Sequence, residues 1–389
     1  MEEWKTCKIG DVCRSISDTY RGNAEEVVLI NTSDVLDGKC LNHLKTPNRD
    51  LKGQFKKTFQ KDDILYSEIR PANKRFAYID FDAVDYIAST KLMVIRSNNN
   101  ILPGYLFYIL TNNSILEELQ VIAESRSGTF PQITFSEVAN IDIYLPPIAK
   151  QKEILSILKS LDDKIENNRK INENLEQQAQ ALFKSWFVDF EPFRDQPFVE
   201  SELGMIPEGW RVGNLFDVAE ILDKYRKPLS GNVREQMQKK EYPYYGATSC
   251  MDYVEDYIFD GIYTLIGEDG SVIKDNGFPF MQYVWGKIWV NNHAHILQGK
   301  NGFSTEMIYI LLSLTNINHL VTGAVQAKLS QANMQKILVV IPPSIILCKF
   351  RAIIDSLFNT IKILFDESRR LSHLRDTLLP KLMSGEIKL

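Results

Sequence analysis

The stretch that decides the fold runs from Leu145 to Phe187 and reads LPPIAKQKEILSILKSLDDKIENNRKINENLEQQAQALFKSWF. Two prolines stand at its start and no further proline or glycine interrupts it, so the sequence predicts one long helix that begins beside Pro147. Apolar and amide side chains recur in it at alternating spacings of four and three, the heptad pattern of a helix that packs on another helix. These seam positions are Ile154, Leu158, Leu161, Ile165, Asn168, Asn172, Leu175, Ala179, Leu182 and Trp186.

A second copy of this pattern lies 196 residues further along the chain, where Pro342 and Pro343 take the place of the first proline pair. Both copies carry a polar seam residue at the same step, Asn172 and Ser368, a device that fixes the register of paired helices. Because one helix cannot bury such a stripe alone, we expect the two to form an intramolecular coiled coil. The alternative is that each helix packs on its own globular region. The second seam is Phe350, Ile354, Leu357, Ile361, Leu364, Ser368, Leu371, Arg375, Leu378 and Leu382.

The composition is that of a folded chain with more than one domain. Its 389 residues allow two or three domains, and 44% hydrophobic residues are ample for their cores. The start MEEWKTCKIG has no charged-then-apolar leader, and no window of about 18 residues is wholly apolar, so we expect a cytoplasmic protein. The five scattered cysteines indicate neither a disulfide framework nor a zinc site. They are Cys7, Cys13, Cys40, Cys250 and Cys348.

The chain as a whole reads as a duplicated unit of globular region plus long helix. We place the boundaries at 1–145 for a first globular domain, 146–190 for the central helix, 191–209 for a linker, 210–341 for a second globular domain and 342–389 for the last helix. Within the globular regions, short β-rich runs alternate with Gly, Pro, Asn and Asp turns and a few helices, which indicates an α+β fold. Weaker landmarks also repeat: Trp4 and Trp210 each precede an Asp-Val pair, and Tyr20-Arg21 recurs as Tyr225-Arg226.

Positive charge is concentrated early in each globular region. The net charge is -5, but residues 39–75 hold ten Lys and Arg against four Asp and Glu, and residues 224–240 hold six against one. Basic loops interleaved with aromatic and amide side chains suit contacts to phosphates and base edges. A solvated charged loop is the simpler explanation of any one such run. Their recurrence at the same place of a repeat favours nucleic-acid binding.

The pattern of globular region and Pro-Pro-led helix, given twice, resembles the specificity subunits of type I restriction-modification enzymes. The resemblance spans nearly the whole chain and is most specific at the helix ends ALFKSWFVDFEPF and LRDTLLPKLMSGEIKL, at IDIYLPP and ILVVIPP, and at DILYSEIRP against YTLIGEDGS and WVNNHAHIL. It implies two mixed α/β target recognition domains, separated by an antiparallel intramolecular coiled coil and related by a pseudo-two-fold repeat.

The resemblance also implies a division of tasks. Each domain would read one half of a bipartite, asymmetric site in double-stranded DNA, while the helices set the spacer and dock two methylation subunits. S-adenosylmethionine would be bound by those subunits, and ATP and Mg by the restriction subunits of a complete system. This chain would then bind no cofactor or metal and catalyse no reaction.

The residues expected to contact DNA are the basic, amide and aromatic side chains of the presumed reading loops, since Arg and Lys read guanine and Asn and Gln read adenine. Residues 67–71 and 267–271 are expected to be matching loops in the two halves. Aromatic side chains at the end of the central helix are the expected partner contacts: Phe183, Trp186, Phe187 and Phe190. For each residue the alternative is an ordinary surface or intradomain contact. The DNA candidates are Arg70, Lys74, Arg75, Lys91, Arg126 and Gln132, then Tyr225, Arg226, Lys227, Tyr245, Asn291, Asn292, His293 and Lys328.

Three alternatives stay open. His293 and His295 flank one residue of a strand-like run and would point the same way, as a metal pair does, although DNA contact or packing is favoured because no third ligand is near. The chain as a stand-alone DNA-modifying enzyme is disfavoured, because it has no Gly-x-Gly dinucleotide motif and no phosphate-binding Gly-Lys-Ser/Thr loop. Its Pro-Pro pairs also lack the polar and aromatic neighbours that hold a flipped base. A coiled-coil scaffold without a nucleic-acid role is the third.

Overall fold

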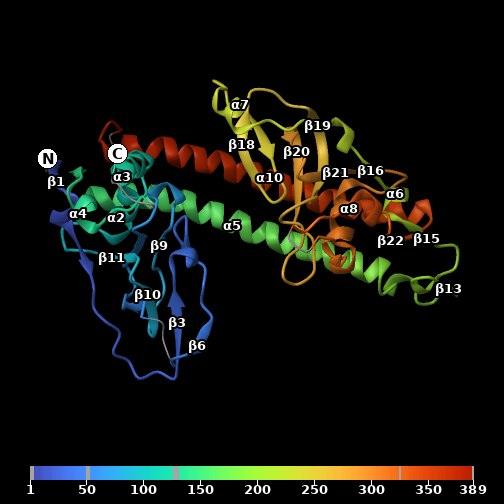
Figure 1. Ribbon diagram of the computed structural model, residues 1–389, viewed down its shortest axis with the longest axis horizontal. Coiled ribbons are helices and arrows are strands. Elements are labelled where there is room, and N and C mark those ends of the chain that lie inside the picture. The colour runs from blue at the N-terminus through green and yellow to red at the C-terminus, as the bar shows by residue number, and fades with distance from the viewer. Residues whose placement is uncertain (1–3, 50–52, 126–130, 324–325, 388–389) are drawn as a thin grey trace. The chain divides into compact units, whose positions relative to one another are not determined.

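The computed structural model describes residues 4–49, 53–125, 131–323 and 326–387. The chain divides into two compact units, the first comprising Met1–Asn167 with Glu367–Leu389 and the second comprising Asn168–Asp366. Each unit therefore contains one globular region and a part of each long helix (Figure 1). In the part of the chain that the structure describes, no helix combines the length and apolar character needed to cross a bilayer.

The two long helices are α5 (Ile148–Phe187) and α10 (Ser344–Met383), and each has 40 residues. Both their first and their last residues differ by 196 positions, so the structure confirms the helices and the offset that the sequence predicts. All twenty seam positions are buried or half-buried. The seams are the faces that each helix turns away from solvent.

Pairing between the two helices is antiparallel within each unit. In the first unit Arg375 Nη1 lies 2.6 Å from Asp162 Oδ1. In the second unit the ring centroids of Phe183 and Phe350 are 5.9 Å apart. Residue numbers increase along α5 while the numbers of their partners decrease along α10. This antiparallel contact confirms the intramolecular coiled coil.

Two polar seam residues of α5 bind backbone groups of α10. Asn168 and Asn172 donate their side-chain N–H groups to the carbonyls of Leu364 (3.5 Å) and Ile361 (3.3 Å). Asn172 thus contacts Ile361, which holds a different step of the repeat, because antiparallel pairing brings different steps of the two repeats together. These bonds require one alignment of the helices, which is how buried amides fix register.

In the first unit, strands follow the orders β6-β3-β10-β7 and β2-β11-β8-β9, and β1 pairs with β12. Short helices pack on them, with α2 (Pro103–Leu110) beginning at a proline that suits a first helical turn. The bounds are β1 Lys5–Lys8, α1 Ile9–Val12, β2 Cys13–Ile16, β3 Glu26–Ile30, β6 Lys45–Pro47, β7 Phe55–Lys57, β8 Ile64–Ser67, β9 Phe76–Tyr78, β10 Tyr86–Ser89, β11 Leu92–Ser97, α3 Asn113–Ser125, α4 Phe135–Ala139 and β12 Asp142–Leu145.

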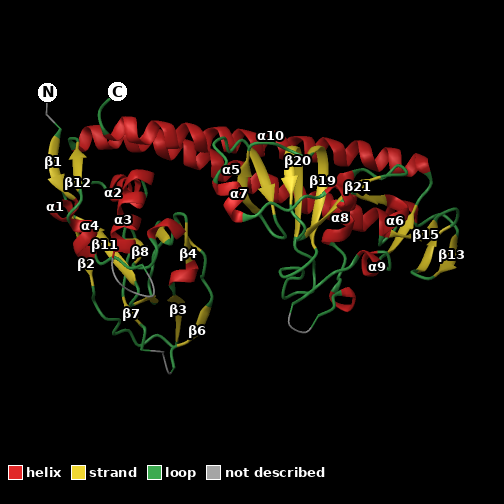
Figure 2. Ribbon diagram, turned by 45° about the horizontal axis from the view of Figure 1, so that its top comes forward, coloured by secondary structure: helices red, strands yellow, loops and turns green. Residues whose placement is uncertain are grey.

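The second unit is built on one six-stranded sheet in the order β16-β21-β19-β20-β17-β18, with α8 (Thr305–Ser313) packed on its central strands (Figure 2). A further pair, β15 and β22, connects the globular region to α10. The bounds are β15 Arg211–Asn214, α6 Leu215–Val218, β16 Ala219–Ile221, α7 Gly231–Glu235, β17 Tyr242–Tyr245, β18 Cys250–Val254, β19 Phe259–Gly267, β20 Met281–Val290, β21 Ala294–Gly299, α9 Gln331–Met334 and β22 Leu338–Ile341.

The two units repeat one backbone plan. Lys5 opposes Leu145 in the pair β1–β12, as Arg211 opposes Ile341 in β15–β22. The next strand in each unit also follows the same register: β2 pairs with β11 as β16 pairs with β21. The duplication that the sequence predicts is therefore present in the hydrogen-bond pattern as well.

The segment after α5 is folded rather than an open linker. Within the predicted linker 191–209, β13 (Phe198–Ser201) and β14 (Gly204–Pro207) form a hairpin. The ring of Phe193 stacks edge-on against Trp210 with centroids 4.9 Å apart. Aromatic side chains supply the core that a Pro- and Glu-rich composition did not suggest.

The same packing uses the aromatic residues predicted to contact partners. Phe183, Phe187 and Phe190 are buried in the core of the second unit, and Trp186 is half-buried against it. Phe187 and Phe350 meet edge to face with centroids 4.6 Å apart. The prediction of a docking surface on these four rings does not fit their burial, because large apolar groups at a helix end can equally cover their own domain.

We predict that Ile354→Ala lowers the free energy of unfolding by about 2–5 kcal/mol, because Ile354 is fully buried on the seam and its loss leaves a cavity. Ile345→Ala on the same helix is the matched control, since that side chain is 64% exposed and should change stability by less than about 0.5 kcal/mol. Urea unfolding of both variants measures the difference. Equal effects would contradict the buried seam.

Candidate nucleic-acid interface

In the first unit three chain segments meet at Glu68, the residue that follows β8. Its backbone N–H donates to the carbonyl of Lys91 (3.0 Å), just before β11. Its carbonyl accepts from the N–H of Ile133 (2.9 Å), just before α4. Next to this residue, Ile69 forms a bridge with Gln132. Lys91 and Gln132, both predicted from sequence, are thus brought to one place by backbone bonds.

The second unit repeats this junction at Glu268, after β19. The N–H of Glu268 donates to the carbonyl of His293 (2.8 Å), and its carbonyl accepts from the N–H of Leu329 (2.8 Å). Asp269 forms the bridge with Lys328 that Ile69 forms with Gln132 in the first unit. The prediction that residues 67–71 and 267–271 are matching loops is confirmed. We call Glu68, Lys91 and Gln132 the first strand-end group, and Glu268, His293 and Lys328 the second.

Each strand-end group contains an exposed lysine held near its glutamate. The Nζ of Lys91 lies 3.8 Å from Glu68 Oε2, and the Nζ of Lys328 lies 3.8 Å from Glu268 Oε1. The two lysines come from different segments, Lys91 from the turn before β11 and Lys328 from the approach to α9. Both side chains are about half exposed, 48% and 54%. The same place in the fold therefore presents an ammonium group to solvent, a donor that suits guanine edges and phosphates.

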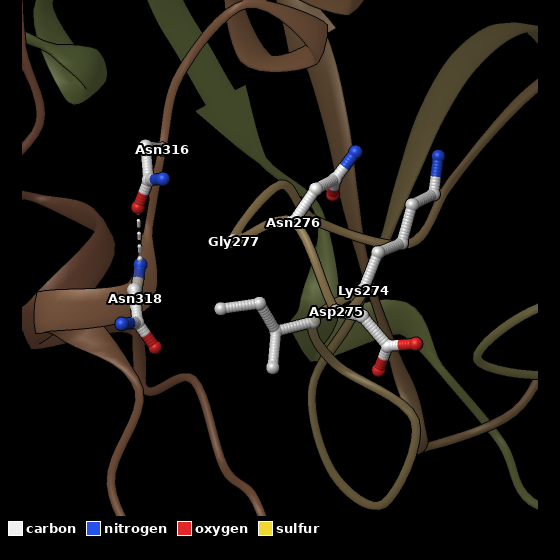
Figure 3. Close-up of a pocket in the computed structure, with 7 residues that line it drawn as sticks. Lys274, Asp275, Asn276, Gly277, Asn316 and Asn318 are labelled. Atoms are coloured by element: carbon white, nitrogen blue, oxygen red, sulfur yellow. Dashed lines mark hydrogen bonds between the residues drawn. The ribbon is translucent and has the colours of Figure 1, made fainter.

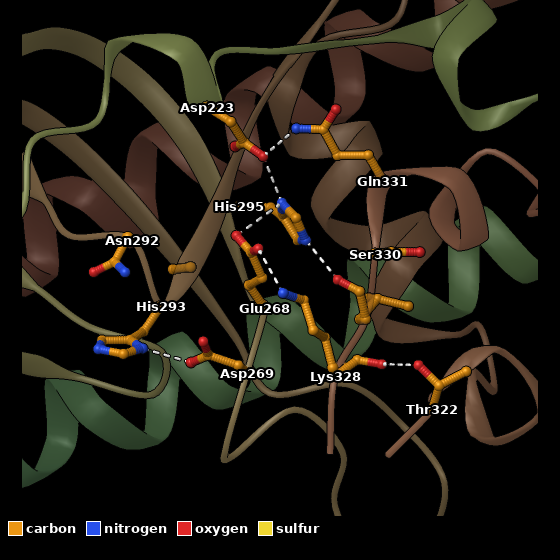
Figure 4. Close-up of polar contacts among 12 residues, drawn as sticks. Asp223, Glu268, Asp269, Asn292, His293, His295, Thr322, Lys328, Ser330 and Gln331 are labelled. Carbon is orange, nitrogen blue, oxygen red and sulfur yellow. Dashed lines mark hydrogen bonds and ion pairs between the residues drawn. The ribbon is translucent and has the colours of Figure 1, made fainter. Parts of the chain in front are cut away.

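His293, another member of the second strand-end group, turns toward Asp269 (Figure 4). Its Nδ1 lies 2.5 Å from Asp269 Oδ1, and its backbone N–H donates to the side-chain oxygen of Asn291 (2.8 Å). Asn291 is buried, whereas Asn292 and His293 are exposed. The short turn before β21 thus has one amide that holds it and two side chains that face solvent.

Beneath these exposed groups lies a buried cluster of charged residues. Asp223 Oδ2 lies 2.5 Å from His295 Nδ1, and it accepts a hydrogen bond from Gln331 Nε2 (2.6 Å). Arg226 Nη1 lies 2.6 Å from Glu268 Oε2. The side chains of His295 and Asp223 are 1% and 5% exposed. We call Asp223, Arg226, Glu268 and His295 the buried ion cluster.

The environment of Asp223 favours its ionised form. Burial by itself would raise the pKa of this carboxyl group. The hydrogen bond from His295 and its positive charge, with further help from the N–H of Ile296 and from Arg226, outweigh burial and lower the pKa below its usual range. An ionised Asp223 accepts a charge-assisted hydrogen bond from His295 Nδ1.

The cluster has a geometry that a metal ion could be expected to use, since ligand atoms of Asp223, Glu268 and His295 all lie within 4.8 Å of one another. Both nitrogens of His295 are nevertheless engaged. Nε2 lies 2.7 Å from the carbonyl of Leu329, which can only accept, and Nδ1 faces the ionised Asp223. Arg226 already supplies a cation to Glu268. The residues therefore fit a hydrogen-bonded ion cluster better than a metal site, and His293 points to Asp269 instead.

The other predicted DNA residues lie around these junctions with varied roles. Arg226 is only 13% exposed and belongs to the buried ion cluster. Arg75 donates to the carbonyl of Ser33 (3.1 Å) within its own unit, and Tyr225 is 51% exposed. Arg126 lies outside the described residues. Exposed or half-buried positions are taken by Arg70, Lys74, Lys227 and Tyr245.

A hollow of about 420 Å³ lies in the loop between β19 and β20 (Figure 3). Amide side chains line one wall, where the N–H of Asn318 donates to Asn316 Oδ1 (3.0 Å). Gly277, at φ +85°, is one of its lining residues, and a Cβ there would stand 2.4 Å from Asn316 Nδ2. The hollow is lined by residues other than Glu268, His293 and Lys328, so it lies outside the second strand-end group.

Comparison with known proteins shows which family this geometry belongs to. The family model described as the type I restriction modification DNA specificity domain matches residues 1–177 and 207–370, one globular region with most of its helix in each match. The chain belongs to this family of type I specificity subunits. It is 33% identical to the type I restriction enzyme HindI specificity subunit of Haemophilus influenzae, over the full length of both chains.

Further relatives agree. This specificity subunit is 30% identical to the type I restriction enzyme MjaIX specificity subunit of Methanocaldococcus jannaschii, over 78% of this chain and 74% of that one. The crystal structure of the type I restriction-modification system S subunit from M. genitalium shares its fold, with a TM-score of 0.51, 16% identity and coverage of 98% and 96%. The chain is therefore a DNA-recognition subunit, as the resemblance implied.

Glu68, Glu268 and Asp223 are not among the DNA candidates predicted from the sequence, because those candidates are the cations and amides that read guanine and adenine. The backbone of Glu68 and Glu268 joins the candidate segments, and Asp223 lies buried beneath them. His295, predicted to contact DNA or to pack rather than to bind a metal, is buried. One signal was available: Glu68 and Glu268 occupy the same place in the two repeats, each within a predicted loop. The contacts of Asp223 span 72 and 108 residues and had no local signal.

We predict that Asp223 stabilises the specificity subunit at neutral pH and ceases to do so in acid. A carboxyl group with a lowered pKa in the folded state contributes stability above its unfolded pKa of about 4, which is lost as the pH falls through the folded pKa. At pH 7, Asp223→Asn should therefore cost about 1–3 kcal/mol in unfolding free energy. The difference from wild type should shrink steadily below pH 4 in urea titrations. A difference independent of pH would contradict an ionised Asp223.

Proposed function

We propose that this specificity subunit reads a bipartite, asymmetric DNA site, one half with each strand-end group. The supporting observation is that the two junctions share their backbone hydrogen bonds at Glu68 and Glu268 but differ in the side chains that they expose. Two domains that recognise two different half-sites need the same backbone arrangement with different exposed side chains.

The chemistry of the exposed side chains suits the major groove. Lys91 can donate to the acceptor edge of guanine, and Gln132 can form two hydrogen bonds with adenine. In the second group, Lys328 and His293 offer donors, and Asn292 offers an amide beside them. Glu68 and Glu268 orient the lysines, and because a carboxylate also accepts from cytosine, they can exclude bases that present only acceptors. Different side chains imply different half-sites.

The long helices would set the distance between the half-sites. A helix of 40 residues is about 60 Å long at about 1.5 Å per residue, which exceeds one turn of duplex DNA, about 34–36 Å. In this proposal the helices also dock two methylation subunits, which bind S-adenosylmethionine, and restriction subunits bring ATP and Mg. This chain supplies recognition and no catalytic group.

Methylome sequencing tests the proposal most directly. We expect cells that express this chain with its methylation subunit to carry methyl-adenine at one interrupted, asymmetric motif. Cells that express the methylation subunit alone should lack it. The motif also gives both half-sites and the length of the unread spacer.

The outcomes separate the alternatives. An unchanged methylome with an active, expressed methylation subunit would refute DNA recognition by this chain and favour a scaffold. Methylation by this chain without any partner subunit would instead identify a stand-alone enzyme.

Two variants, one in each strand-end group, show which half-site each group recognises. We predict that Lys91→Ala relaxes the preferred base in one half-site by about 10- to 100-fold, because a specific contact of this kind contributes about 1–3 kcal/mol of discrimination. Lys328→Ala should do the same in the other half-site only. Each variant is the control for the other, measured by binding of the complex to duplexes with single substitutions. If both variants weaken binding to every sequence equally, the lysines contact phosphates and read no base.

A further inference from the structure

The two units support their strand-end groups by different means. Leu92 opposes Ser67 in the first unit as Ala294 opposes Gly267 in the second, so the next residues, Met93 and His295, hold equivalent positions. Met93 is 2% exposed and belongs to an apolar core. His295 is 1% exposed and belongs to the buried ion cluster. The same site beneath the reading loops is apolar in one unit and ionic in the other.

Asp223 joins three separate elements of the second unit. It leads the 3-10 turn Asp223–Tyr225, its Oδ2 contacts His295 Nδ1 on β21, and the same oxygen accepts from Gln331 Nε2 on α9. Its other oxygen accepts from the backbone N–H of Ile296 (3.0 Å). One buried carboxylate thus ties the turn, the strand and the helix together.

His295 and Arg226 extend these ties to every segment that carries a reading residue. His295 Nε2 lies 2.7 Å from the carbonyl of Leu329, next to Lys328. Arg226 Nη1 donates to the carbonyl of Ala294 (2.8 Å), beside the turn that bears His293, and also contacts Glu268. Glu268 thus belongs to both the second strand-end group and the buried ion cluster, and His293 and Lys328 are each adjacent in sequence to a residue whose carbonyl binds the cluster.

The charged groups in this cluster lie close enough to compensate one another. Asp223 and Glu268 supply negative charge, Arg226 supplies positive charge, and His295 Nδ1 faces both carboxylates. Lys328 contacts Glu268 at 3.8 Å from the exposed side, and Asp269 is occupied by His293. Because the cluster is buried, loss of one charge leaves another without compensation and favours rearrangement of the loops.

We propose that Asp223 and His295 are positioning residues for the second half-site alone, and that the His295 ring, held between Asp223 and the carbonyl of Leu329, keeps the second strand-end group in its reading geometry. This inference rests on the proposed function. Loss of the Asp223 carboxylate or of the His295 ring would remove the contacts that tie the loops at Glu268 and Leu329 to β21. Recognition of the second half-site should then weaken, while recognition through the first strand-end group, supported by Met93, should not.

The test uses the complex of this chain with its methylation subunits and three sets of duplexes: the full site, and the site with one base changed in either half. The variants are Asp223→Asn, His295→Met, which installs the residue of the first unit, and His295→Asn, which keeps a donor near Nδ1. Asp252→Asn is the matched control. It removes a carboxylate that contacts Arg234 and Lys240. Asp252 lies on β18, one edge strand of the sheet, whereas β16 and β21 lie at the opposite edge.

We expect Asp223→Asn and His295→Met to reduce discrimination in the second half-site by about 10-fold or more and to change the first by less than about 2-fold. His295→Asn should retain part of the wild-type discrimination in the second half-site. Asp252→Asn should behave as wild type. The intact first half-site shows in every sample that the complex is folded.

Other results would overturn the inference. Variants that weaken both half-sites equally would show a merely structural role, and variants with wild-type discrimination would show none. A stoichiometric metal ion lost on His295→Met would replace the ion cluster by a metal site. If wild type itself shows no bipartite motif, the proposed function fails, which is distinguishable because that result needs no variant.

Discussion

Neither long helix can bury its seam alone, and the structure of both units depends on the pairing that follows. In the first unit, Ile154 and Leu158 of α5 share a core with Leu379 and Leu382 of α10. In the second, Ala179 and Phe183 share a core with Phe350 and Ile354. Because the helices are antiparallel, the end of the chain completes the unit that its beginning starts. The hydrophobic effect therefore closes each unit with residues far away in sequence.

Duplication gives both units the same backbone frame, formed by the hydrogen bonds at Glu68 and at Glu268. The backbone bonds at Glu68 and Glu268 use only N–H and carbonyl groups, so they constrain no exposed side chain. The exposed side chains of the strand-end groups can therefore differ between the units without loss of these backbone hydrogen bonds. The segment that carries the lysine differs between the units: Lys91 precedes β11, whereas Lys328 precedes α9. Each lysine nevertheless places its ammonium 3.8 Å from the glutamate of its own unit.

The buried residues beneath the two junctions are more constrained than the exposed ones. At Met93 the first unit uses apolar packing, which is tolerant of pH and of small shifts. At His295 the second unit uses hydrogen bonds and charges that must all be satisfied together. A buried network of this kind specifies a single loop geometry more strictly than apolar contacts do.

The sequence by itself determined the helices, the repeat and the family. The Pro-Pro starts, the heptad seams and the 196-residue offset are local or periodic signals, and the bounds of α5 and α10 follow them. It also predicts Lys91, Gln132, His293 and Lys328 as DNA contacts, and the structure brings these residues to the two strand-end groups. Only the tertiary structure decided that Phe183, Phe187 and Phe190 are core rather than surface, that residues 198–207 form a hairpin, and that Asp223 meets His295. The physical reason is that burial and charge pairing are set by contacts between residues distant in sequence, which periodicity does not encode.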